Sequence, residues 1–194
     1  MRIIGGSAGG TILQVPKGFD VRPTPDLVRQ AIFNSLGARV EGATVLELFA
    51  GTGALALECL SRGAKAALCI EKSARHARFI QENGARAQIE SFALQIRVQD
   101  AFSAIKQLAG AAQKFDLVLA DPPYGEKNGS TRSRSFAQQI LDDAWLPALL
   151  RSGGILVLGH TKRDTLEMPP RWHEQKKLNH GDTVMRFLTS EAES

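Results

Sequence analysis

The sequence predicts an α/β fold built on a mostly parallel sheet. Short apolar runs alternate with helical patterns, a glycine turn follows the first run, and acidic residues follow the later ones. Strands separated by helices in this way form βαβ units with parallel strands. The chain has 194 residues, of which 43% are apolar and 23% are charged, which suits one folded unit with its own core.

The first part of the chain predicts an arm and a helix. Residues 1–20 alternate short apolar runs with glycines, which is typical of a small hairpin or arm. Thr24, Pro25 and Asp26 then indicate a helix start, with Thr24 as the N-cap, proline at the first helical position and an acid in the first turn. Apolar residues continue at helical spacing until Gly37, where we expect the helix to end.

From residue 44 onwards, strand and helix patterns alternate. We expect strands over residues 44–49, 66–70, 93–98, 115–120, 155–158 and 184–188, and helices over 54–61, 73–87, 102–108 and 136–150. Residues 125–135 are polar and rich in glycine, serine and arginine, which predicts a mobile loop.

Composition excludes several classes of protein. No window reaches the ~18 uninterrupted apolar residues of a membrane span, and the first residues hold no signal peptide. Cys59 and Cys69 lie in apolar stretches and are expected to be buried free thiols. The histidines and cysteines lack ligand spacing, so we predict no metal site. We expect a soluble, cytoplasmic monomer.

The charge balance is mildly basic. Lysine and arginine total 24 against 20 acidic residues, a net charge of +4. Such an excess is compatible with a polyanionic partner such as RNA. Arg22 and Arg29 lie in an N-terminal segment with few acids, and Lys127, Arg132 and Arg134 crowd the polar loop. We expect these five to contact RNA, with a solvated surface charge as the alternative.

A glycine turn stands where the first strand ends and a helix begins. Gly51 and Gly53 permit a tight turn and a close approach of the backbone to a ligand, and the helix start offers free N–H groups. Glu71 follows Gly53 by 18 residues at the end of the next strand, where its carboxylate can accept hydrogen bonds from ribose hydroxyls. The pattern predicts a nucleoside-containing cofactor and leaves NAD and S-adenosylmethionine open.

Four acidic residues follow consecutive strands. Ligands of open α/β sheets bind outside the carboxyl ends of the strands. We therefore expect the four carboxylates to border one cleft; they belong to Glu47, Glu71, Asp100 and Asp121.

The most specific signal is the turn Asp121-Pro122-Pro123-Tyr124. Its prolines fix φ and so keep the direction of its polar groups. The Asp121 carboxylate and the Pro122 carbonyl can accept the two hydrogens of an exocyclic base amine, which turns the nitrogen lone pair towards an electrophilic methyl group. Tyr124 can stack on the base. We interpret the turn as a catalytic site for amine methylation.

In their order and spacing, these motifs resemble those of class I S-adenosylmethionine-dependent methyltransferases that act on amino groups. The opening residues 1–6, the pattern Arg-Pro-Thr-x-Asp-x-x-Arg over residues 22–29, Phe33-Asn34 and residues 60–64 are similar to the bacterial 16S rRNA (guanine(966)-N(2))-methyltransferase family. The resemblance covers nearly the whole chain. Glu47 replaces the aspartate usual in that family, and the loop over 125–135 is longer and more basic.

The resemblance implies a Rossmann-like fold: a seven-stranded, mostly parallel sheet with helices on both faces and a reversed last strand. Residues 1–40 would be an RNA-facing arm and helix, and residues 41–190 the methyltransferase domain. The substrate would be the N2 amine of a guanine in 16S rRNA, free or within the small ribosomal subunit.

The resemblance also implies how S-adenosylmethionine is bound. Glu71 would lie on the ribose, Asp100 near the adenine amine and Glu47 near the methionine end. The cofactor-binding residues that it implies are Glu47, Phe49, Ala50, Gly51, Gly53, Glu71, Lys72, Asp100, Ala101 and Asp121.

Two alternatives remain open. An adenine-N6 methyltransferase acting on DNA or RNA would use the same proline turn, but so short a chain leaves no room for a separate target-recognition domain. An NAD-dependent oxidoreductase is compatible with the glycine turn and leaves residues 121–124 unexplained. Calorimetry with S-adenosylhomocysteine and with NAD separates these two classes.

Overall fold

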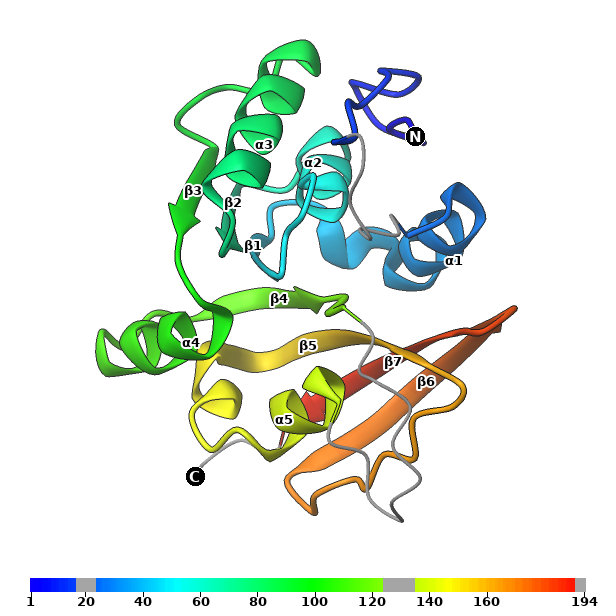
Figure 1. Ribbon diagram of the computed structural model, residues 1–194, viewed down its shortest axis with the longest axis vertical. Helices are drawn as coiled ribbons and strands as arrows, with labels where there is room; N and C mark the ends of the chain where they lie inside the picture. Colours follow the sequence, from blue (N-terminus) through cyan, green and yellow to red (C-terminus); the bar gives the residue numbers. More distant parts are fainter. Residues whose placement is uncertain (17–23, 124–134, 191–194) are drawn as a thin grey trace.

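The computed structural model describes residues 1–16, 24–123 and 135–190. Within them the chain forms a seven-stranded sheet of order β3-β2-β1-β4-β5-β7-β6 (Figure 1). The strands are β1 (Thr44–Leu48), β2 (Ala66–Glu71), β3 (Leu94–Val98), β4 (Phe115–Ala120), β5 (Leu150–Thr161), β6 (Trp172–His180) and β7 (Thr183–Ser190). The helices are α1 (Asp26–Leu36), α2 (Ala54–Ser61), α3 (Ala74–Arg86), α4 (Ala101–Gly110) and α5 (Phe136–Asp142), with the short 3-10 helices η1 (Gly37–Val40) and η2 (Leu146–Leu149).

The topology confirms the predicted fold class. Strands β1 to β5 pair in parallel, and β7 runs antiparallel to both of its neighbours, β5 and β6. Alternate strand residues face opposite sides of the sheet. One side packs on α1, α2 and α3, and the other on α4, α5 and η2. The helices therefore cover both faces, and the last strand is the reversed one.

Three local predictions were wrong. Strand β6 was not predicted, because an edge strand whose residues are mostly exposed has no apolar run. The helix expected over residues 136–150 ends at Asp142, since the Asp143 carboxylate accepts hydrogen bonds from the N–H groups of Trp145 (2.8 Å) and Leu146 (3.0 Å). Thr24 is not an N-cap: α1 begins after Pro25 and has no side-chain cap.

The N-terminal arm packs on α2. An antiparallel bridge between Arg2 and Ile12 closes it into the expected small hairpin. Its apolar side chains, including those of Ile3 and Leu13, join a buried cluster with residues of α2. Gly6 crosses the end of α2 with φ +78°, and a Cβ there would lie 1.8 Å from the Ser61 carbonyl oxygen, so only glycine permits this approach.

Glu58 of α2 joins three segments below the surface. Its fully buried carboxylate accepts hydrogen bonds from the N–H groups of Ile4 (2.7 Å) and Gly5 (2.9 Å) and from Arg62 Nε (2.7 Å). Arg29 Nη1 of α1 lies 3.9 Å from Glu58 Oε2. A buried charge is tolerated only when donors and counter-charges satisfy it, and here the arm and α1 supply them.

The structure also bears on the cysteines and on membrane-spanning segments. Cys59 and Cys69 are free and buried, as predicted. In the described part of the chain, no helix has the length and apolar character that crossing a bilayer requires.

Replacing Glu58 should strongly destabilise the fold. Glu58→Ala removes a buried counter-charge of Arg29 and the acceptor of two partly buried arm N–H groups, so we expect the free energy of unfolding to fall by about 3–5 kcal/mol. Urea denaturation measures the loss, with the same change at the exposed Glu90 as the control. Equal stability of the two variants would contradict the role of Glu58.

Candidate active site

The predicted site residues gather at the carboxyl edge of the sheet. Strands β1, β2 and β4 are adjacent and parallel, so the turns after them share that edge. Contacts join these turns: Gly51 N–H donates to Glu71 Oε2 at 2.7 Å, and the Phe49 ring meets the Phe102 ring edge-on with centroids 5.9 Å apart. The glycine turn, the end of β2 and the start of α4 therefore form one site.

Helix α3 packs against the glycine turn and bonds it. Gly53 adopts φ +74°, and a Cβ added to it would lie 2.7 Å from Ile80 Cγ2, so glycine permits both the turn and the close helix. Asn83 of α3 donates from Nδ2 to the Thr52 carbonyl (3.1 Å). Asn83 also bonds both backbone groups of Gln14, which ties the N-terminal arm to the same turn.

Glu71 closes the turn and lies at its rim. One carboxylate oxygen accepts from Gly51 N–H, and the other accepts from Ser73 N–H at 2.8 Å with His76 Nδ1 at 3.6 Å. The side chain is 7% exposed, next to the exposed Lys72. Each carboxylate oxygen has a second lone pair, so the group can still accept hydrogen bonds from a ligand.

Glu47 is buried beneath the start of α2. Its Oε2 accepts from Ala56 N–H at 2.9 Å, and the Cys69 thiol lies 3.8 Å away. Burial raises the pKa of Glu47 to about 8, the backbone donors of Ala56 and Leu55 oppose this rise, and the charge of Asp121 adds to it. Burial therefore favours the protonated form of Glu47 in the ligand-free protein.

Asp100 and Ala101 mark the start of α4. Asp100 is its N-cap, because Oδ1 accepts from the N–H groups of Phe102 and Ser103, each at 3.1 Å. Ala101 is buried directly after it. The cap fixes the direction of the Asp100 carboxylate at the site's rim.

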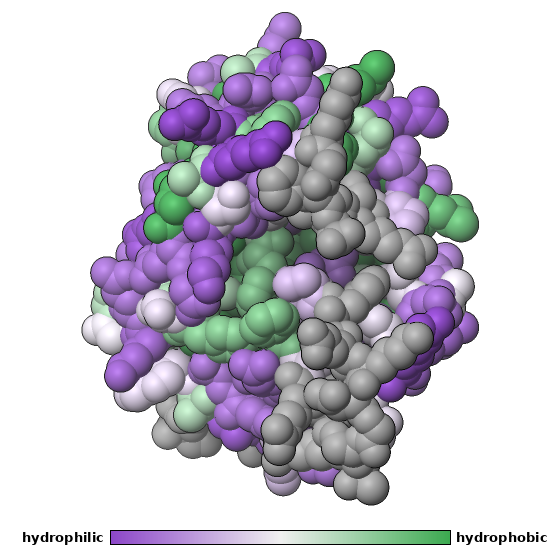
Figure 2. Space-filling model, in the orientation of Figure 1, coloured by the Kyte–Doolittle hydropathy of each residue, from purple (hydrophilic) through white to green (hydrophobic). Residues whose placement is uncertain are grey.

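An aromatic cluster that sequence reasoning missed lies beside these carboxylates. The Phe136 ring, from the start of α5, lies 5.7 Å from that of Phe49 and 6.2 Å from that of Phe102. Figure 2 shows a hollow near the middle of this face, with apolar residues on its floor and polar residues around it. The cluster gives the site a surface suited to flat rings. Of its three rings, Phe49 was predicted from the sequence as a site residue, whereas Phe102 and Phe136 were missed.

Asp121 stands at the end of β4 and is held on two sides. Thr24 Oγ1 donates to its Oδ2 at 2.5 Å. Gly159 of β5 leaves room for the other oxygen, because a Cβ at that position would lie 2.3 Å from Oδ1. Burial raises the pKa of Asp121, and the Thr24 hydrogen bond opposes that rise. Pro122 is buried and Pro123 is exposed.

Of the five residues predicted to contact RNA, Arg29 lies in the described part of the chain. Arg29 is fully buried, and its Nη2 donates to the Arg2 carbonyl (2.5 Å) and to Asp26 Oδ1 (2.7 Å). The prediction that Arg29 contacts RNA is therefore wrong, because a buried guanidinium cannot reach a phosphate. The remaining predicted residues lie outside the described part of the chain, and these are Tyr124, Arg22, Lys127, Arg132 and Arg134. The predicted loop over residues 125–135 lies outside it too, except for its last residue.

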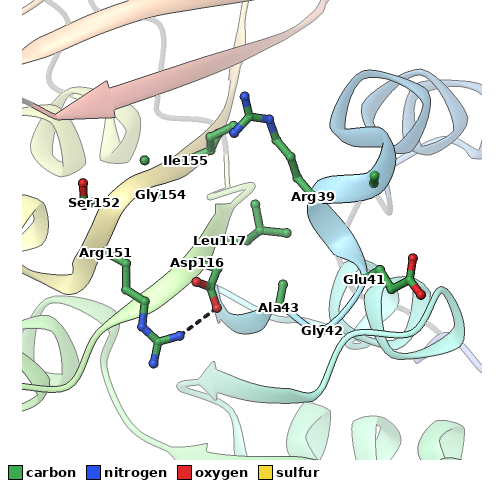
Figure 3. A pocket seen from close by; sticks show the side chains of 12 residues that line it. Arg39, Glu41, Gly42, Ala43, Asp116, Leu117, Arg151, Ser152, Gly154 and Ile155 are labelled. Atoms are coloured by element: carbon green, nitrogen blue, oxygen red, sulfur yellow. Dashed lines mark hydrogen bonds and ion pairs between the residues drawn. The ribbon is translucent and has the colours of Figure 1, made fainter.

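A cavity of about 360 Å³ lies at the opposite edge of the sheet, near the amino ends of β1, β4 and β5 (Figure 3). Its lining holds two basic and two acidic residues, Arg39, Arg151, Glu41 and Asp116, and Arg151 Nη1 lies 2.9 Å from Asp116 Oδ2. The cavity is far along the strands from the predicted catalytic turn, so we do not assign the site there. Among the described residues, no cluster of histidine, cysteine and acidic side chains could hold a metal ion.

Comparisons with known proteins agree with this geometry. A family model, Conserved hypothetical protein 95, matches residues 1–189. The chain is 30% identical to ribosomal RNA small subunit methyltransferase D of Escherichia coli (strain K12), over 100% of this chain and 91% of that protein. It is 34% identical to a candidate rRNA methyltransferase of Bacillus subtilis (strain 168), over 66% of this chain and 68% of that protein. A solved structure of a candidate methyltransferase from Escherichia coli aligns with TM-score 0.76 and 28% identity, covering 100% of this chain and 99% of that one.

The buried Glu47 should make stability depend on pH. Because its pKa is raised in the folded state, the folded chain holds the proton more tightly, and stability falls as pH rises from 4.5 to about 8. At 1.36 kcal/mol per pKa unit, the full loss is about 5 kcal/mol. Glu47→Gln removes this loss, so the variant should gain on the parent across this range in urea denaturation, whereas Glu90→Gln should not. A constant difference between parent and variant from pH 5 to 9 would contradict the burial argument.

Proposed function

Because this chain belongs to the Conserved hypothetical protein 95 family, we propose that it transfers a methyl group from S-adenosylmethionine to the N2 amine of a guanine in 16S rRNA. The observation that carries the proposal is the Asp121 carboxylate, held at the end of β4 beside the glycine turn. The relatives named as small-subunit rRNA methyltransferases support the substrate class. The choice of guanine N2 rests on the sequence resemblance.

The residues at the carboxyl edge fit a nucleoside-containing cofactor. Glu71 and Asp100 offer carboxylate oxygens at successive strand ends, suited to ribose hydroxyls and to the adenine amine. Phe102 lies against Phe49 and offers a ring face for a base, and the glycine turn lets backbone approach the ligand. S-Adenosylmethionine supplies, when bound, an electrophilic methyl group whose bonding electron pair leaves with sulfur.

The chain's own residues would then prepare the target nitrogen. An exocyclic base amine is a poor nucleophile, because its lone pair is delocalised into the ring. Asp121 and the Pro122 carbonyl would accept its two hydrogens, which holds the nitrogen in a geometry that frees the lone pair. Once methylated, the nitrogen is positively charged, and Asp121 can take the proton that it releases. Orientation and charge stabilisation do the work, so no strong base is needed.

The two alternatives differ in what they explain. Adenine-N6 methylation would use the same carboxylate and carbonyl, so the target base separates it from guanine-N2 methylation. An NAD-dependent oxidoreductase gives the Asp121 turn no role, and the methyltransferase relatives count against it. RNA contacts by Arg22, Lys127, Arg132 and Arg134 stay part of the proposal, since those residues lie outside the described part of the chain.

Incubating the protein with S-adenosylmethionine and small ribosomal subunits from a strain lacking the gene should yield N2-methylguanosine. Mass analysis of the nucleosides identifies the product. Asp121→Asn keeps the shape and removes the charge, so we expect methyl transfer to fall by at least about 100-fold. Affinity for S-adenosylhomocysteine, measured by calorimetry, should stay within a few-fold.

The outcomes separate the possibilities. N6-methyladenosine as the product would overturn guanine and keep amine methylation. Calorimetric binding of NAD without binding of S-adenosylhomocysteine would overturn the whole class. Loss of cofactor binding in a folded Asp121→Asn variant would move Asp121 from the substrate to the cofactor.

Glu71 should contribute to cofactor affinity. Hydrogen bonds to a charged acceptor contribute about 1.5–3 kcal/mol, so Glu71→Ala should weaken S-adenosylhomocysteine binding by roughly 10- to 150-fold. The matched control is Glu41→Ala at the opposite edge, which should bind like the parent. Unchanged affinity in a folded Glu71→Ala variant would leave Glu71 with only its role in closing the turn.

A further inference from the structure

The Thr24 hydroxyl serves the site rather than its own helix. Helix α1 starts at Asp26 without a side-chain cap, although a threonine stands two residues earlier. A threonine hydroxyl has one hydrogen to donate. Thr24 donates it to Asp121 Oδ2, 97 residues further along the chain. A local capping role therefore does not account for this side chain.

The start of α1, which directly follows Thr24 and Pro25, is fixed by a partly buried network. Arg29, one turn into α1, donates to Asp26 and to the Arg2 carbonyl, and lies near Glu58. Glu58 in turn bonds the arm at Ile4 and Gly5. The start of α1 is thus fixed to the arm and to α2, the helix that follows the glycine turn. Thr24 therefore directly precedes a helix start that is anchored on two sides, which suits a group that orients a carboxylate.

Both oxygens of Asp121 are constrained in different ways. Oδ2 accepts the Thr24 hydrogen bond, and Oδ1 occupies the space that the missing Cβ of Gly159 leaves. Without the hydroxyl, rotation of the carboxylate is limited on one side only. The two contacts together fix the plane in which Asp121 can accept a hydrogen from a ligand.

We infer that Thr24 is a positioning residue for Asp121: its hydroxyl holds the carboxylate in the orientation that accepts a hydrogen of the target amine. This inference rests on the proposed function of Asp121. It assigns the N-terminal segment a part in the reaction step, in addition to the predicted contact with RNA. The arm and α1 would then complete the active site rather than only extend it.

The same hydrogen bond also affects ionisation. Burial raises the pKa of Asp121, and the Thr24 hydroxyl lowers it by stabilising the charged form. Among the described residues, the charged group that interacts with Asp121 is Glu47 on β1, and Gly159 of β5, beside Oδ1, carries no charge. Removing the hydroxyl should therefore leave Asp121 protonated up to a higher pH.

The test compares Thr24→Val, which keeps the shape without a donor, with Thr24→Ser, which keeps the donor. In Thr24→Val we expect kcat at pH 7 to fall about 10- to 100-fold and the acidic limb of the kcat profile to move up by roughly 1–2 pH units. KM for S-adenosylmethionine should stay within a few-fold. Thr24→Ser should restore both kcat and the profile.

A second measurement does not depend on activity. Carbon NMR follows the titration of the Asp121 carboxyl, assigned by its absence in Asp121→Asn. Its pKa should be higher in Thr24→Val than in the parent and in Thr24→Ser. A folded Thr24→Val with the parent's kcat, pH profile and titration would overturn the inference, and so would a loss that Thr24→Ser does not restore. If Thr24→Val alters the Asp121 titration but the parent protein methylates no RNA, the proposed function is overturned instead.

Discussion

The arrangement of the site depends on one buried carboxylate that is not part of it. Glu58 lies in the middle of α2, and its two oxygens are shared between the arm, the end of its own helix and the Arg29 side of α1. Because removing a charge from water is costly, these donors must stay in place together. The position of α2 therefore determines that of α1. Since the glycine turn begins α2 and Thr24 precedes α1, the two ends of the candidate site are coupled through the protein interior.

A second polar group supports the same arrangement from the other side. Asn83 of α3 bonds both backbone groups of Gln14 and the carbonyl of Thr52. Asn83 thus ties the glycine turn to both the arm and α3. Apolar packing alone would let these segments shift relative to one another, because apolar contacts are not directional. Directional bonds from buried Glu58 and Asn83 provide the precision that the hydrophobic clusters on either side of the sheet lack.

The sequence predicts most of the fold because each buried strand is a short apolar run. It does not predict β6, whose edge position tolerates polar residues, or the break at Asp143, whose side chain bonds the backbone that follows it. For the site, local motifs predict the turn and the carboxylates, since strand ends of a parallel sheet share an edge. They misplace Thr24 and Arg29, whose partners lie far away in the chain. The local pattern predicts that Thr24 caps a helix and that Arg29 is a surface cation. In the structure, Thr24 instead bonds Asp121, and Arg29 is buried against Arg2 and Glu58.

The two carboxylates nearest the proposed reaction centre differ in their surroundings. Glu47 is buried under α2, and burial raises its pKa, which favours its protonated form. Its neutral form removes the repulsion that a second charge would exert on Asp121. Burial also raises the pKa of Asp121, but the Thr24 hydroxyl opposes that rise by stabilising the ionised form. Paired acidic groups in active sites commonly differ in this way, with one kept neutral while the other acts as the anion. An anion is the stronger acceptor for amine hydrogens, so the donor of Thr24 and the burial of Glu47 support the proposed chemistry from opposite sides.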